Sequence, residues 1–244
     1  MSLLLEWAKE EPSSVDAAKQ GISHVLLVRH GETDWNAEGR MQGQLDVALN
    51  DAGRQQARRF GQHLVRLGIA PRISAVVSSD LSRAKETADI IAEVCSNPER
   101  QLDPRLREVS TGDLQGLLVK DVQSKIQAVK AAWDRGDFSC AYPGGESADL
   151  AMLRGLKALD DAAQLGSVVL VVAHGGVMRL SAIGIELCGV QITAASLASP
   201  KAAKVKQAPI TNCCCSLLSY DHHTQMFAPR FWFERIESAL DDTG

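Results

Sequence analysis

A long apolar run and an excess of basic charge are both missing from this sequence. No apolar run reaches the length needed to span a bilayer, and the opening segment 1–21 carries acidic residues too early for a secretory or transit peptide. Asp and Glu total 30 against 26 Lys and Arg, a net charge of −4. Because an acidic surface repels a phosphate backbone, we expect a soluble, cytoplasmic protein that binds neither nucleic acid nor membrane. Any basic site must be local.

Cysteine is scarce as well. The six cysteines show no paired CxxC spacing, and their density is too low for a disulfide-stapled secreted domain. Three of them form the run 213–215 within an apolar stretch typical of a strand. We expect these thiols to be reduced and to pack as small apolar side chains.

The remaining composition is ordinary for a soluble globular protein, with 45% hydrophobic and 23% charged residues. A length of 244 residues suits a single domain with a sizeable core. We place this domain at residues 23–235, after an N-terminal extension (1–22) and before a C-terminal tail (236–244).

Three short apolar runs, at residues 24–28, 73–79 and 167–173, resemble strands. Each is rich in β-branched residues and does not alternate with polar ones, as is typical of strands buried on both faces. Between and before them, apolar residues recur at helical spacing and stop near glycine or proline. These residues are Ala57, Phe60, Leu64 and Leu67; Leu81, Ala84, Ala88, Ile91 and Cys95; and Leu150, Leu153, Leu156 and Leu159. The alternation predicts a three-layer α/β/α fold around a mainly parallel sheet.

Polar residues follow each predicted strand. Parallel strands put their carboxyl ends on one edge of the sheet, where ligands of open α/β folds bind. We therefore expect the residues after the three strands to share one crevice. They are Arg29 and His30; Ser78, Ser79 and Arg83; and His174 and Gly175.

Two arginines beside a histidine indicate a phosphoryl group, because guanidinium groups match phosphate oxygens in pairs. Gly31, Gly175 and Gly176 allow close backbone approach, and helices starting after Gly31 or Gly175 would aim N–H groups at an anion. Neighbouring arginines disfavour the charged imidazolium, so His30 is biased toward the neutral form that attacks phosphorus.

The segment "LLVRHGETDWN" resembles the signature of the histidine phosphatase superfamily, the phosphoglycerate mutase-like family. Further motifs in the same order extend the resemblance over residues 23–220. They are "GRMQGQLDVALNDAGRQQA", "SSDLSRAKETA", "LREVSTGDLQG", "PGGES" and "VVAHGGVMR".

This resemblance implies that His30 becomes a phosphohistidine, while Arg29, Arg83 and His174 hold the phosphoryl group. It implies that Glu108 donates a proton to the leaving oxygen and later activates water. It implies neither metal nor cofactor. The positions matching the substrate or phosphate pocket are Asn36, Gln42, Gly43 and Gly175.

Some of these residues also have ordinary structural explanations. Asn36 and Gln42 could instead bond backbone in a turn, and Glu108 would be unremarkable as a surface acid. Lys85 and Arg179 could contact the substrate, but we favour charges on helix faces for both. His63, His222 and His223 are assigned to the surface. We expect the loops at 119–141 and 191–209 to shape the pocket.

The segment after Glu108 is compact and resembles the phosphatase branch, whereas classical mutases carry a long insertion there. We therefore predict a metal-independent phosphatase acting on a small phosphorylated metabolite: a phosphosugar, a phosphoglycerate or phosphoserine. The alternatives are a phosphoglycerate mutase, a protein phosphatase or an inactive phospho-ligand-binding protein. A metal-dependent hydrolase is disfavoured because HxxxH and HxH spacings are absent and arginines repel a cation. The apolar ending "MFAPRFWFERI" predicts an edge strand that could form a homodimer contact.

Overall fold

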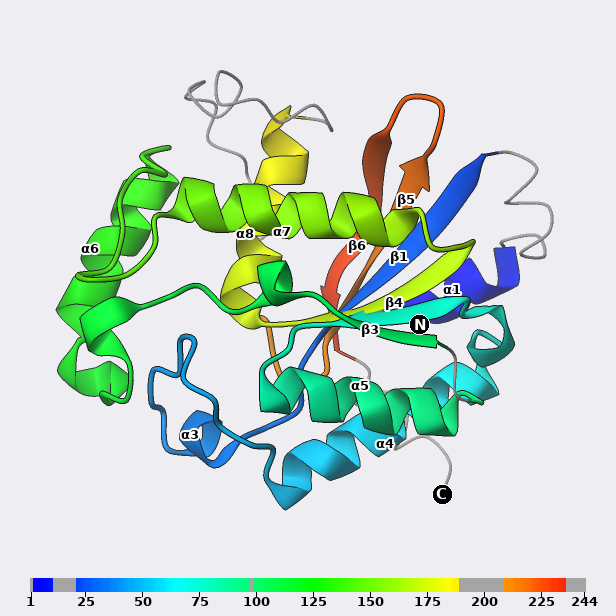
Figure 1. Ribbon diagram of the computed structural model, residues 1–244, viewed down its shortest axis with the longest axis horizontal. Coiled ribbons are helices and arrows are strands. Elements are labelled where there is room, and N and C mark those ends of the chain that lie inside the picture. Colours follow the sequence, from blue (N-terminus) through cyan, green and yellow to red (C-terminus); the bar gives the residue numbers. More distant parts are fainter. Residues whose placement is uncertain (1, 11–20, 97–98, 189–208, 236–244) are drawn as a thin grey trace.

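The computed structural model describes residues 2–10, 21–96, 99–188 and 209–235 (Figure 1). It confirms the predicted α/β class. One six-stranded sheet has the order β3-β2-β4-β1-β5-β6. Its strands are β1 (Ile22–Arg29), β2 (Ala75–Ser78), β3 (Glu99–Leu102), β4 (Val168–Ala173), β5 (Cys215–Asp221) and β6 (Met226–Glu234).

The sheet is mainly parallel, as predicted. β3, β2, β4 and β1 run in one direction, and Arg29 at the end of β1 is in register with Ala173 at the end of β4. β5 is antiparallel to both of its neighbours, β1 and β6. The ends of β1, β2 and β4 therefore share one edge of the sheet.

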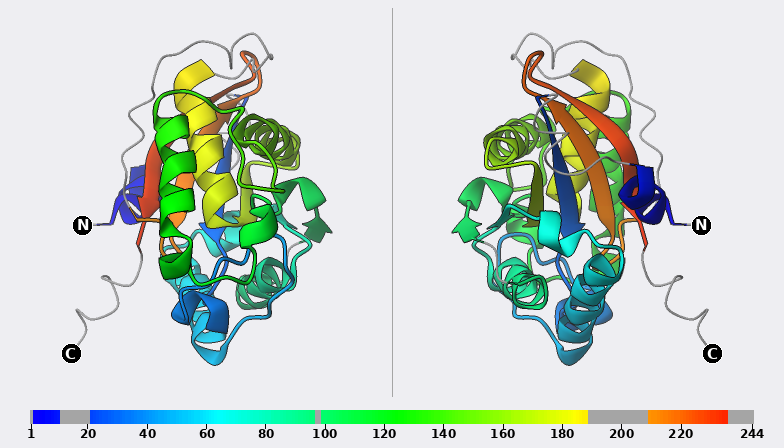
Figure 2. Two further views of the ribbon diagram at one scale, coloured as in Figure 1. Left: turned by 90° about the vertical axis from the view of Figure 1, so that its left-hand side faces the viewer. Right: turned by 90° about the vertical axis from the view of Figure 1, so that its right-hand side faces the viewer.

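Helices cover both faces of this sheet, which gives the expected three layers (Figure 2). One hydrophobic cluster joins α1, α4 and α5 to one face, and a second joins α7 and α8 to the other. The α-helices are α1 (Leu3–Glu10), α3 (Asp34–Ala37), α4 (Asp51–Arg66), α5 (Ser82–Val94), α6 (Gln123–Asp134), α7 (Ala148–Ala163) and α8 (Gly175–Cys188). The described residues also form the short 3-10 helices η1 (Ala70–Arg72), η2 (Pro104–Leu106), η3 (Gly112–Leu114) and η4 (Val119–Asp121).

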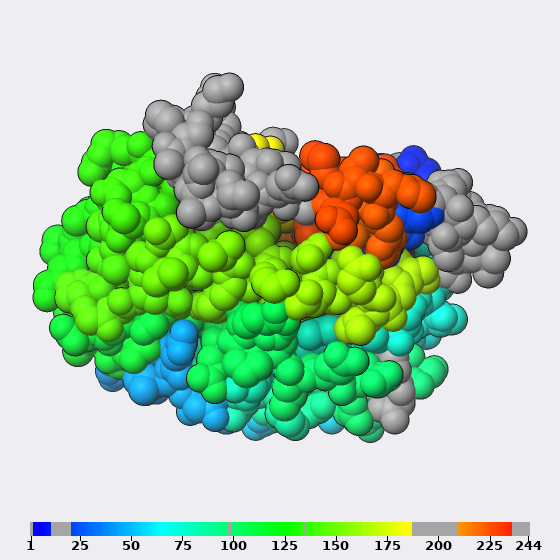
Figure 3. Space-filling view, turned by 45° about the horizontal axis from the view of Figure 1, so that its top comes forward, coloured from blue at the N-terminus to red at the C-terminus, as the bar shows by residue number. Residues whose placement is uncertain are grey.

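The three predicted helices are present as α4, α5 and α7. α4 is followed by Leu67 as its C-cap and by Gly68 at φ +69°, the left-handed conformation that commonly ends helices. In α7 the predicted apolar stripe is half wrong. Leu156 and Leu159 are buried, but Leu150 and Leu153 are 61% and 45% exposed. The buried face is made largely of small side chains, which let α7 lie close to the sheet, and its outer face forms part of the surface in Figure 3.

Sequence patterns missed α1 and β3, and they assigned the segment that forms α6 to a loop. α1 is buried through Leu4 and Trp7, and the backbone N–H groups of Leu3 and Leu4 donate to the Glu234 carboxylate at the end of β6. β3 is exposed along its length and so lacks the apolar signal of the other strands. The domain boundaries at residues 22 and 235 remain predictions.

The cysteine run packs as expected of small apolar residues. Cys213, Cys214 and Cys215 are buried, and burial raises the pKa of Cys214 to about 11. β6 is an edge strand, as predicted, and Pro229 lies within it. Among the described residues, no helix is long and apolar enough to cross a membrane.

Candidate active site

The carboxyl ends of three parallel strands bring the predicted charged residues together. Arg29 closes β1 and is followed by His30, and His174 follows β4. Arg83 lies in the first turn of α5, just after β2. The expected convergence at this edge therefore occurs.

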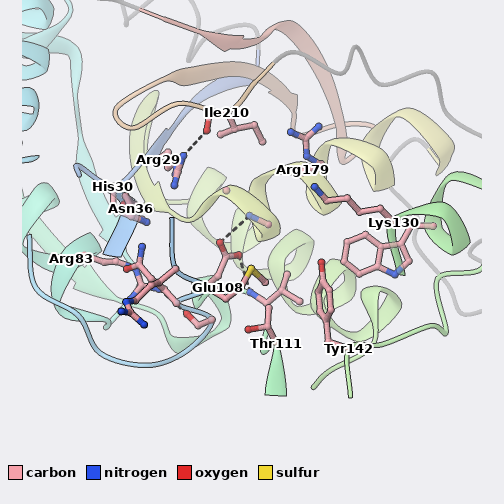
Figure 4. Close-up of a pocket in the computed structure, with 18 residues that line it drawn as sticks. Arg29, His30, Asn36, Arg83, Glu108, Thr111, Lys130, Tyr142, Arg179 and Ile210 are labelled. Carbon is pink, nitrogen blue, oxygen red and sulfur yellow. Dashed lines mark hydrogen bonds between the residues drawn. The ribbon is translucent and has the colours of Figure 1, made fainter. Parts of the chain in front are cut away.

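A cavity of about 290 Å³ opens at this edge. Its charged lining is strongly basic for a protein with a net charge of −4, because the described residues that line it include five Arg or Lys side chains and one acidic side chain, Glu108. In Figure 4, Arg29, His30 and Arg83 gather at one end, and Lys130 and Arg179 lie toward the other. The lining residues are Arg29, His30, Asn36, Arg40, Met41, Gln42, Gly43, Arg83, Glu108, Val109, Thr111, Lys130, Trp133, Tyr142, Gly175, Gly176, Arg179 and Ile210.

Two buried histidines stand at the inner end. The rings of His30 and His174 have centroids 5.1 Å apart and are tilted by 56°. Burial holds the pKa of both rings well below the ordinary value, and the positive charges of Arg29 and Arg83 lower it further. Both imidazoles are therefore neutral at physiological pH.

The backbone fixes which nitrogen of His30 can react. Its Nδ1 lies 2.6 Å from the carbonyl oxygen of Gly31. A carbonyl oxygen only accepts hydrogen bonds, so we assign the ring proton to Nδ1. The neutral ring then keeps its lone pair on Nε2, which is the form a nucleophile requires.

Both arginines are anchored to backbone carbonyl groups. Arg29 donates through Nη1 to Ile210 (2.5 Å), and Arg83 donates to Leu45 and Gly43 (2.8 Å each). Burial lowers the pKa of Arg29 and lowers that of Arg83 to about 10, which leaves both guanidinium groups charged at neutral pH. Rigid cations at fixed positions suit the binding of an anion.

Several buried polar atoms around His30 have no hydrogen-bond partner within the described part of the chain. Unpaired buried polar groups are costly, so a cluster of them indicates a ligand site. Six such atoms lie here, namely Arg29 Nε, Arg83 Nε, both ring nitrogens of His174, Gln42 Oε1 and Thr111 Oγ1.

Glu108 lies beside this cluster and is held tightly. Its carboxylate accepts hydrogen bonds from the backbone N–H groups of Val109 (2.8 Å), Gly176 (3.0 Å) and Val177 (3.1 Å). The prediction that the N-terminus of α8 aims its N–H groups at a ligand is therefore wrong in part, because two of them bind Glu108. A Cβ at Gly176 would collide with the Glu108 carboxylate, so a glycine is needed here.

The structure places every other predicted binding residue at the pocket. Asn36 also forms a capping box with Thr33 and accepts a hydrogen bond from Asn212 Nδ2, so it both lines the pocket and holds its loop. Gln42, Gly43 and Gly175 line the cavity as well. The helix predicted directly after Gly31 does not form there. α3 starts at Asp34, and the Gly31 N–H donates to Thr87 Oγ1.

The segment 119–141 lines the outer part of the pocket, as predicted, through Lys130 and Trp133 of α6. The sequence analysis did not single out these two side chains or Tyr142, which also lines the pocket. The spacing of three between Lys130 and Trp133 on one helix was the available signal. Arg179 lines the cavity, which agrees with the substrate-contact alternative rather than with the favoured helix-face charge.

The remaining assignments divide. Lys85 pairs with Asp89 on the exterior of α5, as expected. His63 of α4 is buried rather than on the surface, with only 5% of it exposed. The first predicted pocket loop, 119–141, contains α6. Of the second, 191–209, residues 191–208 lie outside the described residues. No group of three or more His, Cys, Asp or Glu side chains suited to a metal ion occurs among the described residues.

Neutral, buried histidine within a basic pocket at the end of a parallel sheet defines an enzyme of phosphoryl transfer. A family model described as histidine phosphatase superfamily (branch 1) matches residues 25–229. The chain belongs to the histidine phosphatase superfamily.

Individual relatives agree with this family. The chain is 46% identical to phosphoglycerate mutase-like protein 4 of Arabidopsis thaliana, over 69% of this chain and 74% of the relative. It is 44% identical to a metal-independent phosphoserine phosphatase of the same plant, over 65% and 66% of the two chains. A solved mycobacterial glucosyl-3-phosphoglycerate phosphatase in complex with VO3 matches with a TM-score of 0.68 and 29% identity, covering 87% of this chain and 100% of that chain. These matches confirm the expected enzyme class, a phosphatase acting on phosphate monoesters.

Proposed function

We propose that this chain hydrolyses a small phosphorylated metabolite through a phosphohistidine at His30. The observation that carries the proposal is the cluster of buried, partly unpaired polar groups around a neutral imidazole. Arg29 and Arg83 supply positive charge and N–H groups, and His174 supplies a second ring. A phosphoryl group, with its negative oxygens, matches this set.

The first half-reaction transfers the phosphoryl group to the enzyme. His30 Nε2 attacks phosphorus and the bond from phosphorus to the ester oxygen breaks. Glu108, in the carboxylic acid form that this step requires, gives its proton to that oxygen. The guanidinium groups of Arg29 and Arg83 stabilise the charge that develops on the phosphoryl oxygens. The alcohol leaves.

The second half-reaction returns the enzyme to its starting state. Glu108, now a carboxylate, takes a proton from water while the water oxygen attacks phosphorus. The bond from phosphorus to His30 Nε2 breaks, and inorganic phosphate leaves. No step needs a metal or another cofactor.

The far end of the pocket bears on the substrate. Lys130, Arg179 and Tyr142 lie there (Figure 4), and the Trp133 ring packs against that of Tyr142. A substrate with a carboxylate a few bonds from its phosphate would set the second anion against these cations. Phosphoserine and the phosphoglycerates have this form, and relatives are named for both.

A phosphoglycerate mutase is the second candidate, because a relative with 46% identity is named mutase-like. The two activities share the phosphohistidine and differ in what accepts the phosphoryl group. Water yields phosphate, whereas a hydroxyl group of the bound phosphoglycerate yields its isomer.

The test is a panel of phosphorylated metabolites that includes phosphoserine, 3-phosphoglycerate, sugar phosphates and a phosphotyrosine peptide. Phosphate release is measured with a chelator present, alongside the His30→Ala variant. We expect chelator-resistant release that the variant loses, and an acid-labile phosphoenzyme in the wild type.

Three outcomes would overturn this function. Isomerised phosphoglycerate without phosphate release would make the chain a mutase. A preference for the phosphotyrosine peptide would make it a protein phosphatase. Tight phosphate binding with no turnover of any compound would leave a binding protein.

A further inference from the structure

A dense polar network lies behind Glu108, outside the pocket. Arg154 of α7 is its centre, with its side chain 19% exposed. Its Nη1 donates to the carbonyl oxygens of Arg105 and Arg107 (2.6 Å each), and its Nη2 donates to the carbonyl oxygen of Glu108 (3.0 Å). One guanidinium group therefore binds three carbonyl groups of the segment that carries Glu108.

Glu146 completes the network from the other side. Arg154 donates to it through Nη2 (2.5 Å) and Nε (3.0 Å), a two-point pair that fixes the guanidinium plane. Glu146 also accepts a hydrogen bond from the backbone N–H of Ser110 (2.8 Å), two residues after Glu108. Gln44 Nε2 donates to the Glu108 carbonyl oxygen (3.0 Å). The backbone on both sides of Glu108 is thus tied to one ion pair.

The consequence concerns the Glu108 carboxylate. Its backbone is fixed by Arg154 and Glu146, and its oxygens are fixed by the N-terminus of α8. Neither Arg154 nor Glu146 lines the cavity. A displacement of about 1 Å at a proton donor costs on the order of 10²-fold in rate.

We propose that Arg154 and Glu146 are positioning residues, which hold the Glu108 carboxyl group at the distance and angle needed to protonate the leaving oxygen. This inference rests on the proposed role of Glu108. Arg154 lies outside the pocket, and its hydrogen bonds to the carbonyl oxygens of the segment fix the position of the Glu108 backbone relative to His30.

The test separates proton donation from general folding by using two leaving groups. p-Nitrophenolate leaves without a proton, whereas an alkoxide needs one. We expect Arg154→Met to lower kcat/KM for the best alkyl phosphate of the panel about 10-fold more than for p-nitrophenyl phosphate. Glu146→Gln keeps one acceptor oxygen and should show a smaller effect in the same direction.

Arg105→Met is the matched control. Arg105 also joins this segment to α7, through Asp103 and Asp161, but none of its side-chain bonds reaches Glu108. It should lower the two rates equally or leave them unchanged. Glu108→Gln should show the largest loss of kcat/KM for the alkyl phosphate relative to p-nitrophenyl phosphate.

The outcomes are distinct. An equal loss on both substrates in Arg154→Met, with Glu108→Gln still selective, would overturn the positioning role alone and leave the proposed function standing. No selectivity in Glu108→Gln would remove Glu108 as the proton donor, and with it both proposals for this residue.

Discussion

The groups around His30 and those around Glu108, on two sides of the pocket, differ in how fully their polar atoms are hydrogen-bonded. Around His30, buried groups of Arg29, Arg83 and His174 retain polar atoms without partners. Around Glu108, by contrast, both carboxylate oxygens and the backbone carbonyl oxygen accept hydrogen bonds.

The difference separates binding from positioning. Each buried donor without a partner carries a desolvation cost, and hydrogen bonds to a bound phosphoryl group offset that cost. The satisfied carboxylate holds one orientation before any ligand arrives, so little reorganisation is needed during reaction. Substitutions on the His30 side should therefore lower the rate for all substrates by similar factors. Substitutions on the Glu108 side should lower it by different factors for different leaving groups.

The largest effect should come from Arg83. We expect Arg83→Met to lower kcat about 10²- to 10³-fold for alkyl and aryl phosphates alike, because it removes a fixed charge from the transition state. Arg83→Lys should recover little, since an ammonium group cannot copy the planar fork. Steady-state kinetics with both substrates measures this. Arg100→Met, which loses a surface pair with Asp89, is the control. A strong leaving-group dependence in Arg83→Met would contradict the division between the two sides.

Gly176→Ala should act on the Glu108 side. The new methyl group would collide with the Glu108 carboxylate and displace it. We expect kcat/KM for alkyl phosphates to fall about 10- to 10²-fold, with a smaller loss for p-nitrophenyl phosphate. Gly175→Ala is the comparison, because its Cβ would meet Arg29 at an ordinary 3.6 Å. If Gly175→Ala had the larger leaving-group effect, the placement of Glu108 would be wrong.

Lys130→Met sharpens the comparison at the outer end of the pocket. Removing this exposed cation should raise KM for phosphoserine or 3-phosphoglycerate about 3- to 5-fold. It should leave p-nitrophenyl phosphate unchanged, because that substrate has no carboxylate. Lys125→Met, on the same helix but outside the cavity, supplies the control. Equal KM changes for all substrates would argue against a carboxylate site.

The smallest effect is on stability. His30 and His174 have folded-state pKa values well below their ordinary ones, so below about pH 6.5 the unfolded chain binds more protons than the native state. The free energy of unfolding should therefore fall with decreasing pH, by at most about 1.4 kcal/mol per pH unit for each histidine. Urea unfolding between pH 7 and pH 5 measures the slope. The double variant His30→Gln/His174→Gln should flatten it, and an unchanged slope would count against neutral, buried rings.

Much of the fold could be predicted because its signals are local. Strands β1, β2 and β4 are buried on both faces and appear in the sequence as plain apolar runs. The site residues that follow these strands lie close to those runs in the sequence, so the same pattern locates them. β3 could not be found this way, because an exposed edge strand carries no apolar run. The error in α7 has a related cause: its buried face is made largely of small residues, so leucine spacing pointed to the wrong side.

The parts of the site that escaped prediction depend on contacts between distant segments. Arg154 and Glu146 reach Glu108 across more than 35 positions, and no spacing rule links them. In the sequence, Arg179 cannot be told from an ordinary charged residue on a helix surface. It lines a pocket because α6, which is distant in sequence, forms another part of the pocket wall. The role of Glu108 could be expected only from family resemblance, because its surroundings come from α7 and α8.

The position of β1 in the sheet has a consequence for how the enzyme is made. β1 pairs with β4 and β5, whose residues begin at 168 and 215, and Arg29 is held by Ile210. On the ribosome, His30 therefore emerges early but has neither sheet neighbour until most of the chain has been synthesised. Contacts this far apart in sequence make folding slow. A chain truncated before β5 would carry His30 and Glu108 yet should fail to assemble a working pocket.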